Sequence, residues 1–198
     1  MSLQDISDEL GITEAALYHC ISSKDDLPNI VPSECYDTPD ADEYNAVTAG
    51  FVDADGHRIY CYPRYYLNIV LCNLQRPEFV QLYSVLNGEA LNPEHPAHHF
   101  FIGRHMRQWE MICSMNWLLP PDMTEDRFYD LSTLAMSAMD GLQYRWLGDD
   151  SMNLLERWMS LSDIIFPESE WKGFLNPSEH DPKQETDCML PLTLSVRA

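Results

Sequence analysis

The chain of 198 residues carries a formal net charge of −20 at pH 7, and 45% of its residues are hydrophobic. This hydrophobic fraction is typical of a packed globular protein, and the negative charge opposes non-specific attraction to nucleic acid or to an anionic membrane. No apolar run approaches the roughly 18 to 20 residues that a spanning helix needs, and no signal-peptide pattern opens the chain. We therefore expect a cytoplasmic protein without a membrane partner, with its six scattered cysteines reduced.

The first predicted elements are two helices separated by a glycine, within residues 2–27. Ser2 is a good N-cap for a helix that ends at Gly11, because glycine accepts the left-handed conformation at a helix end. Thr13 is placed to cap a second, short helix, and Ser23 to cap a third. A helix, a glycine turn and a short helix form the helix-turn-helix pattern, in which the second helix enters the DNA major groove.

The stretch LQDISDELGITEAALYHCISSKDDL resembles the helix-turn-helix signature of tetracycline-repressor (TetR) family regulators. The matching positions are Ile6, Gly11, Thr13, Leu17, Tyr18, Ser23, Lys24 and Leu27. Two further stretches, RPEFVQLYSVLNGEALNPEHPAHHFFIGRHMRQWE and MDGLQYRWLGDD, are similar to the ligand-binding part of a TetR subgroup. Together these similarities cover most of residues 2–166.

The resemblance implies an all-α dimer with an N-terminal helix-turn-helix and a larger helical domain that binds a small-molecule effector. The implied regions are a DNA-binding domain (1–32), an acidic connecting segment (33–62), an effector-binding and dimerisation domain (63–166) and a C-terminal extension (167–198). Carried over by motif position, the residues that contact double-stranded operator DNA are Thr13, Glu14, Ala15, Ala16, Tyr18, His19 and Lys24.

The chain departs from the family pattern at its N-terminus. Family members place an amphipathic helix, often with basic residues, ahead of the position where this chain starts, so the first helix of the DNA-binding domain is missing. Without that helix, Leu3, Ile6, Leu10 and Leu17 are expected to lack a cover. Either the true start lies upstream of Met1 or the chain has lost a working DNA reader.

The charge of the N-terminal region bears on its affinity for DNA. Residues 1–30 contain one lysine and six carboxylates, which gives a net charge of −5. Contacts between basic side chains and phosphates normally supply most of the non-specific affinity for DNA. Binding by this chain is therefore predicted to be weak and salt-sensitive.

The segment that follows differs from the long helix that links the two domains in the family. Pro28 and Pro32 interrupt a helix there, since a proline inside a helix costs about 3 kcal/mol. Residues 33–56 carry seven carboxylates and no basic residue, which is typical of a solvated loop, and a short helix is predicted over residues 40–48. The stretch FVDADGHRIYCY predicts a small hairpin around an Asp-Gly turn.

Three longer helices are predicted in the second half of the chain. Apolar and aromatic side chains at spacings of three and four predict one helix over residues 98–116. Thr124 is placed to cap a second helix that runs through Leu147, and Ser151 a third that ends before Pro167. By resemblance the last two, within 124–166, form a two-fold homodimer interface; the alternative is that they close the core of the monomer.

Residues on these helices that combine an aromatic ring with a polar group are candidates for an effector pocket, although each could instead belong to the core. The candidates are Tyr66, Tyr83, His105, Trp109 and Tyr144.

A histidine cluster offers a different hypothesis, a zinc or nickel site. Its members are His95, His98, His99 and His105. No HExxH motif accompanies them and the cysteines are not spaced as partners, so we predict no metal and no cofactor. No phosphate loop, nucleophile elbow or paired-carboxylate motif indicates an enzyme. The favoured hypothesis is a repressor that responds to an effector; the alternative is a dimeric effector-binding or protein-interaction module whose DNA binding is weak or lost.

Overall fold

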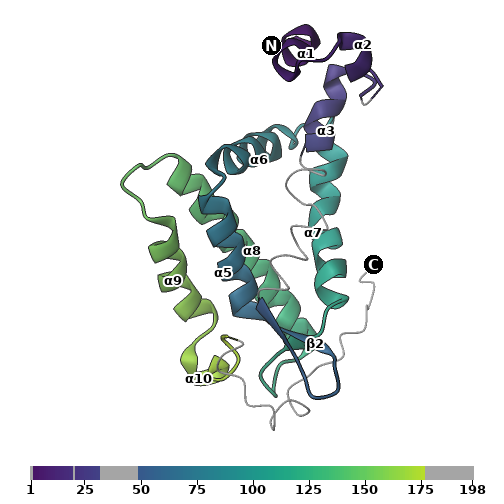
Figure 1. The fold of residues 1–198 in the computed structure, drawn as a ribbon. Helices are drawn as coiled ribbons and strands as arrows, with labels where there is room; N and C mark the ends of the chain where they lie inside the picture. Colours follow the sequence, from purple (N-terminus) through teal and green to yellow (C-terminus); the bar gives the residue numbers. More distant parts are fainter. Residues whose placement is uncertain (1, 20, 32–48, 177–198) are drawn as a thin grey trace.

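The computed structural model describes residues 2–19, 21–31 and 49–176, and this part of the chain is mostly helical (Figure 1). The short helix predicted over residues 40–48 lies outside the described residues, as does the C-terminal end beyond residue 176. No helix in the described ranges is both long and apolar enough to cross a bilayer. The helices and strands are α1 (Leu3–Leu10), α2 (Glu14–Leu17), the 3-10 turn η1 (Lys24–Asp26), α3 (Leu27–Val31), β1 (Gly50–Val52), β2 (Arg58–Cys61), α5 (Tyr62–Leu74), α6 (Pro77–Glu89), α7 (His98–Cys113), β3 (Trp117–Leu118), α8 (Glu125–Leu147), α9 (Leu154–Ile165) and α10 (Glu168–Trp171).

The N-terminal helices begin and end where the sequence predicts. The Ser2 hydroxyl accepts from the backbone N–H of Asp5, and the Asp5 carboxylate accepts from the backbone N–H of Ser2. Gly11 ends α1 at φ 66°, the left-handed conformation that glycine adopts at little steric cost. The Thr13 hydroxyl accepts from the backbone N–H of Ala16 and so caps α2. These local predictions are confirmed.

A small apolar cluster holds α1 and α2 together. Leu3, Leu17 and Ile21 are buried in it, which corrects the expectation that Leu3 and Leu17 lack a cover. Leu17 and Ile21 cover the first part of α1, whereas Leu10 in its last turn is 60% exposed. The partly buried side chains around this cluster are Ile6, Leu27 and Ile30.

The described part of the chain is mostly helical, but a small three-stranded sheet departs from the all-α prediction. The predicted hairpin is present, with β1 antiparallel to β2 and Phe51 opposite Ile59. β3 then pairs parallel to β2, with Tyr60 opposite Trp117. This strand exists because α7 ends at Cys113 and not at residue 116, and the Trp117 indole N–H donates to the carbonyl of Ile112 (2.7 Å) at that end.

An aromatic core joins the sheet to α5, α8 and α9, which lie alongside one another in Figure 1. Tyr62, at the start of α5, is fully buried and lies at its centre. The Tyr62 ring centroid is 4.9 Å from that of Trp117, 4.6 Å from that of Phe128 and 6.1 Å from that of Phe166. Such edge-on contacts between large rings add to the stabilisation from burial alone. The main core therefore extends from the sheet along α5, α8 and α9.

The two helices predicted to form a dimer interface are present, with one corrected cap. Thr124 caps α8 as predicted, by accepting from the backbone N–H of Arg127. α9 is capped by Asn153, which accepts from Glu156, and not by Ser151. The Ser151 hydroxyl, three residues before α9 begins, donates to the Asp149 carboxylate (2.6 Å).

Small residues on α8 divide between the core and the surface. Ala135 is fully buried in the core of this chain, whereas Ala138 is half-buried and Gly141 is exposed. Leu134 on α8 and Ile164 on α9 are exposed, at 55% and 74%. The pair of helices therefore closes the core with one side and leaves apolar side chains on another. The C-terminal extension begins with α10, whose Glu170 forms an ion pair with Arg127 on α8.

Candidate functional site

The residues predicted to contact DNA lie on and around α2, at the end of the molecule away from the sheet (Figure 1). Tyr18 is 50% exposed and Glu14 is half-buried. The exposed members of the set are Thr13, Ala15, Ala16, Tyr18, His19 and Lys24. Their side chains are therefore accessible to a macromolecular partner, and Thr13 is accessible although its hydroxyl also caps the helix.

The electrostatics of this surface are unfavourable for phosphates. Lys24 is the one lysine or arginine in residues 1–30, against six carboxylates. The backbone N–H of Ser2 donates to Asp5 and, with the Ser2 hydroxyl, lowers the pKa of the Asp5 carboxyl, which keeps it negative. Any affinity for a duplex must therefore come largely from neutral donors and shape.

A cavity among the described residues lies between α6, α7 and α8, and we refer to it as the α6–α8 cavity. Its volume is about 210 Å³. Side chains of all three helices line it. Tyr83 and Asn87 belong to α6, and the other lining residues lie on one side of α7 and on one side of α8. The lining residues from α7 and α8 are Phe101, Arg104, His105, Gln108, Thr133, Met136, Ser137 and Asp140.

A narrow crevice continues the cavity between α7 and α8. Its volume is about 10 Å³, room for roughly one water molecule. His105, Thr133 and Met136 line both spaces, and Trp109 and Tyr129 form the apolar wall of the crevice. The Trp109 and Tyr129 rings meet edge-on at 4.9 Å. The combined space therefore has a polar chamber and an aromatic end.

Arg104 lies in the wall of the α6–α8 cavity, where at least two contacts hold it. Its guanidinium carbon lies 4.7 Å from the centroid of the Tyr83 ring, and its Nη1 donates to Gln108 Oε1 at 3.1 Å. A guanidinium over an aromatic face gains a cation–π attraction of about 1 kcal/mol. Arg104 is thus a fixed positive group, and Asp140 brings a negative group from α8.

The five predicted pocket residues are not brought together as a set. Tyr83, His105 and Trp109 line the cavity or its crevice. Tyr66 lies in the aromatic core, where its ring stacks on Trp158 at 5.7 Å and burial raises the pKa of its hydroxyl to about 12. Tyr144 is 71% exposed and lines neither space. The spacing of residues along a helix does not distinguish a position in the cavity wall from one in the core or on the surface. That outcome depends on which neighbouring helix covers the residue.

Polar cavity residues were missed by the sequence reasoning, which considered aromatic side chains first. Arg104 and Gln108 are four residues apart on α7, and Thr133, Ser137 and Asp140 recur at spacings of four and three on α8. A polar stripe at helical spacing beside an aromatic one is a signal that could have identified them.

The clustered histidines make local contacts. His98 Nδ1 lies 2.8 Å from the carbonyl of Ala90, and His95 Nδ1 accepts from the backbone N–H of Ala97 (3.2 Å). His105 Nε2 is 3.5 Å from the Tyr129 hydroxyl. Among the described residues, none of these histidines belongs to a group of three or more converging metal-ligand side chains.

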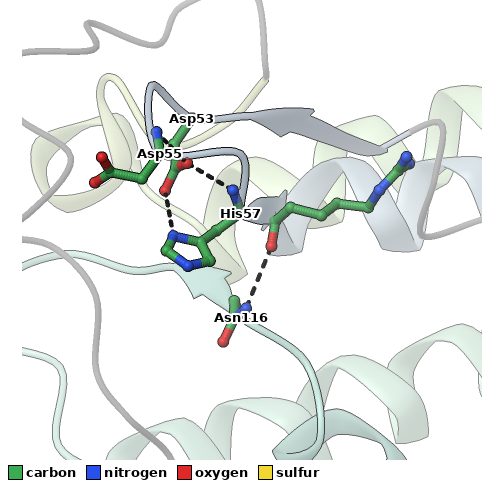
Figure 2. Close-up of polar contacts among 5 residues, drawn as sticks. Asp53, Asp55, His57 and Asn116 are labelled. Carbon is green, nitrogen blue, oxygen red and sulfur yellow. Dashed lines mark hydrogen bonds and ion pairs between the residues drawn. The ribbon is translucent and has the colours of Figure 1, made fainter.

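One such group does lie in the turn between β1 and β2, drawn in Figure 2. It consists of Asp53, Asp55 and His57, and the latter two are exposed. Asp53 accepts from the backbone N–H groups of Asp55 (3.0 Å) and His57 (2.7 Å), and its other oxygen is 3.3 Å from His57 Nδ1. Desolvation works against the charged form, but these hydrogen bonds keep the pKa of the Asp53 carboxyl below its usual value. These contacts shape the hairpin turn, and the turn by itself explains why the three side chains lie close together.

Comparison with known proteins identified no relative of this chain. No family model matches the chain, and neither a curated protein nor a solved structure matches it.

Proposed function

We propose that the protein is a TetR-like transcriptional regulator, a repressor whose dimer binds double-stranded operator DNA and responds to a small-molecule effector. The observation that carries the proposal is the capped α1–Gly11–α2 unit, whose second helix exposes the side chains expected to meet DNA. The α6–α8 cavity supports the second half of the proposal, because it offers a concave site with several polar groups and an aromatic end.

Each exposed group on and around α2 has a defined role in this proposal. Thr13 and Tyr18 bind phosphates through their hydroxyl groups, and Lys24 supplies the one positive charge. Glu14 accepts a hydrogen bond from a cytosine amino group, and Ala15 contacts a thymine methyl. Ala16 and His19 complete the set that faces base edges. Because these contacts are mostly neutral, the affinity is low and sequence-dependent contacts make up a large share of it.

The effector acts by stabilising one spacing of α6, α7 and α8. A ligand shifts a conformational equilibrium only by its difference in affinity for the two states. The cavity walls come from three separate helices, so a change in their separation changes the cavity directly. Repression and release then correspond to two arrangements of the same helices, and the function requires neither a metal nor a cofactor.

A second candidate is a dimeric effector-binding or protein-interaction module on the same scaffold, with DNA binding weak or lost. It is favoured by the net charge of −5 in residues 1–30 and by two exposed apolar side chains beside α2, Leu10 and Ile12. An acidic surface with apolar side chains suits a basic protein partner better than a phosphate backbone.

A gel-shift with duplex fragments from the region upstream of the protein's own coding sequence separates the two candidates. The repressor is expected to shift one fragment at about 50 mM salt and to bind it roughly tenfold more weakly near 200 mM, because a dimer supplies one Lys24 from each subunit. Lys24→Gln should weaken the shift, whereas Lys172→Gln, an exposed lysine on the far end of the molecule, should not. Absence of any shift at low salt favours the interaction module.

A further inference from the structure

We infer that the α6–α8 cavity takes a small, uncharged molecule with one ring and a polar head that both donates and accepts hydrogen bonds. The inference rests on the proposed effector role of the same cavity and adds the chemical class of the effector. Its grounds are the size of the cavity, the balance of its charges and the kinds of group in its walls.

The size of the cavity limits the ligand to a single ring. Its volume of about 210 Å³ corresponds to roughly seven water molecules at about 30 Å³ each. Sites for drug-sized ligands span about 300 to 1,000 Å³. The crevice beyond His105 adds only about 10 Å³, so it cannot hold a second ring.

The charges that line the cavity cancel. Arg104 on α7 and Asp140 on α8 carry opposite signs. Both act on the nearby hydroxyl of Tyr66, where, after the larger effect of burial, Asp140 raises the pKa and Arg104 lowers it. An ion of either sign would lose part of its hydration in this half-open site, and no net charge of the opposite sign would compensate. An uncharged ligand incurs less of this cost.

The walls offer both donors and acceptors. The Arg104–Gln108 hydrogen bond (3.1 Å) fixes a guanidinium and an amide side by side on α7. Thr133 and Ser137 present hydroxyl groups from α8, and the Thr133 hydroxyl donates to the carbonyl of Tyr129 (3.0 Å), so its oxygen can still accept. A head with one donor and one acceptor, such as a primary amide, can bond to both helices at once.

Aromatic side chains provide the surface for the ring. Tyr83 and Phe101 lie with their ring centroids 5.4 Å apart on one side of the cavity. Trp109 and Tyr129 line only the crevice, which is too small for a ring. A planar ring placed against Tyr83 and Phe101 makes edge or offset contacts worth about 1 kcal/mol each beyond its burial.

Three isosteric probes test the charge preference with the full chain: benzamide, benzoate and benzamidine. They share one ring and a planar three-atom head, and at about pH 8 they are neutral, negative and positive respectively. Titration calorimetry should show benzamide binding at least about tenfold more tightly than either ion. Tightest binding by benzoate or benzamidine, or no benzamide binding up to about 10 mM, overturns the inference.

Single substitutions test whether benzamide binds in the α6–α8 cavity. Ser137→Trp should abolish benzamide binding, whereas Ser169→Trp, at an exposed position on α10, should not. Arg104→Met should turn the preference toward benzamidine by about tenfold, and Asp140→Asn toward benzoate. Benzamide binding that survives Ser137→Trp would show that the ligand sits elsewhere and would overturn the inference.

The outcomes are separable from those of the DNA-binding experiment. Benzamide binding in the cavity by a protein that shifts no duplex supports the ligand class and counts against operator binding. A protein that shifts its promoter fragment and binds none of the three probes retains operator binding and overturns the ligand class alone.

Discussion

Two buried phenol groups, Tyr62 and Tyr66, couple the stability of the core to alkaline pH. Their hydroxyl groups are 3.3 Å apart, and burial raises the pKa of Tyr66 to about 12 from its usual value of 10. Burial also raises the pKa of Tyr62 well above its usual value. Both groups are therefore neutral in the folded protein at a pH where an unfolded chain would already have lost those protons.

This difference predicts a loss of stability above pH 10. A raised folded-state pKa favours the folded state in full below the unfolded pKa, and that contribution is lost as the pH rises from about 10 through 12. Between pH 9 and pH 11 the Tyr66 contribution should fall by about 1 kcal/mol. Urea titrations of the native protein and of Tyr66→Phe at both pH values measure the fall in the free energy of unfolding. The variant should lose less stability over this range. Equal losses in both proteins would contradict the placement of Tyr66 in the core.

Cys113, at the end of α7, should react slowly as a nucleophile. Burial, and then the negative charge of Glu125, raise the pKa of its thiol to about 11. The thiolate is the reactive form, so little of it exists at neutral pH. We expect alkylation at Cys113 in the folded protein to be at least about tenfold slower than in urea, as measured by mass spectrometry of the peptide. Equal rates would place this thiol on the surface.

At the scale of the element, α9 provides a direct test of helix capping. Asn153→Ala should lower the free energy of unfolding by about 1 kcal/mol, because the backbone N–H of Glu156 loses its acceptor. Ser151→Ala is the matched control, and it should change the stability by less than about 0.5 kcal/mol, since Ser151 bonds only to the exposed Asp149. Chemical denaturation of both variants gives the comparison, and a larger effect at Ser151 would restore the cap that the sequence predicts.

The elements that were predicted correctly are those fixed by short-range contacts. The Ser2 and Thr13 caps, the Gly11 helix end and the Thr124 cap each depend on groups within four residues. The predicted Ser151 cap was wrong, because a second good capping residue, Asn153, follows two positions later and the packing of α9 decides between them.

Features that depend on distant partners were not predicted. The pairing of Tyr60 with Trp117 joins positions 57 apart, and the sequence around Trp117 carries no strand pattern longer than two residues. The α6–α8 cavity likewise depends on which side chains of three helices converge. For that reason Tyr83, His105 and Trp109 line it or its crevice, whereas Tyr66 and Tyr144, with similar side chains, do not.

At the scale of the whole molecule, the proposed dimer should depend on the exposed apolar side chains of α8 and α9. Apolar side chains gathered on two packed helices mark an interaction surface more often than single exposed ones do. Ile164→Asp should shift the protein from dimer to monomer in light scattering at micromolar concentration. Leu91→Asp, at an 82% exposed position between α6 and α7, should leave the mass unchanged. An unchanged mass in both variants would place the interface elsewhere.

The measurement that tests the central proposal most directly is the affinity for a promoter duplex and for a scrambled duplex of the same composition, followed by fluorescence anisotropy. A repressor that reads bases through α2 should bind the promoter fragment at least about a thousandfold more tightly at about 50 mM salt, and lose this binding as salt rises. Equal affinity for both duplexes, or no binding to either at low salt, would contradict a role in operator recognition.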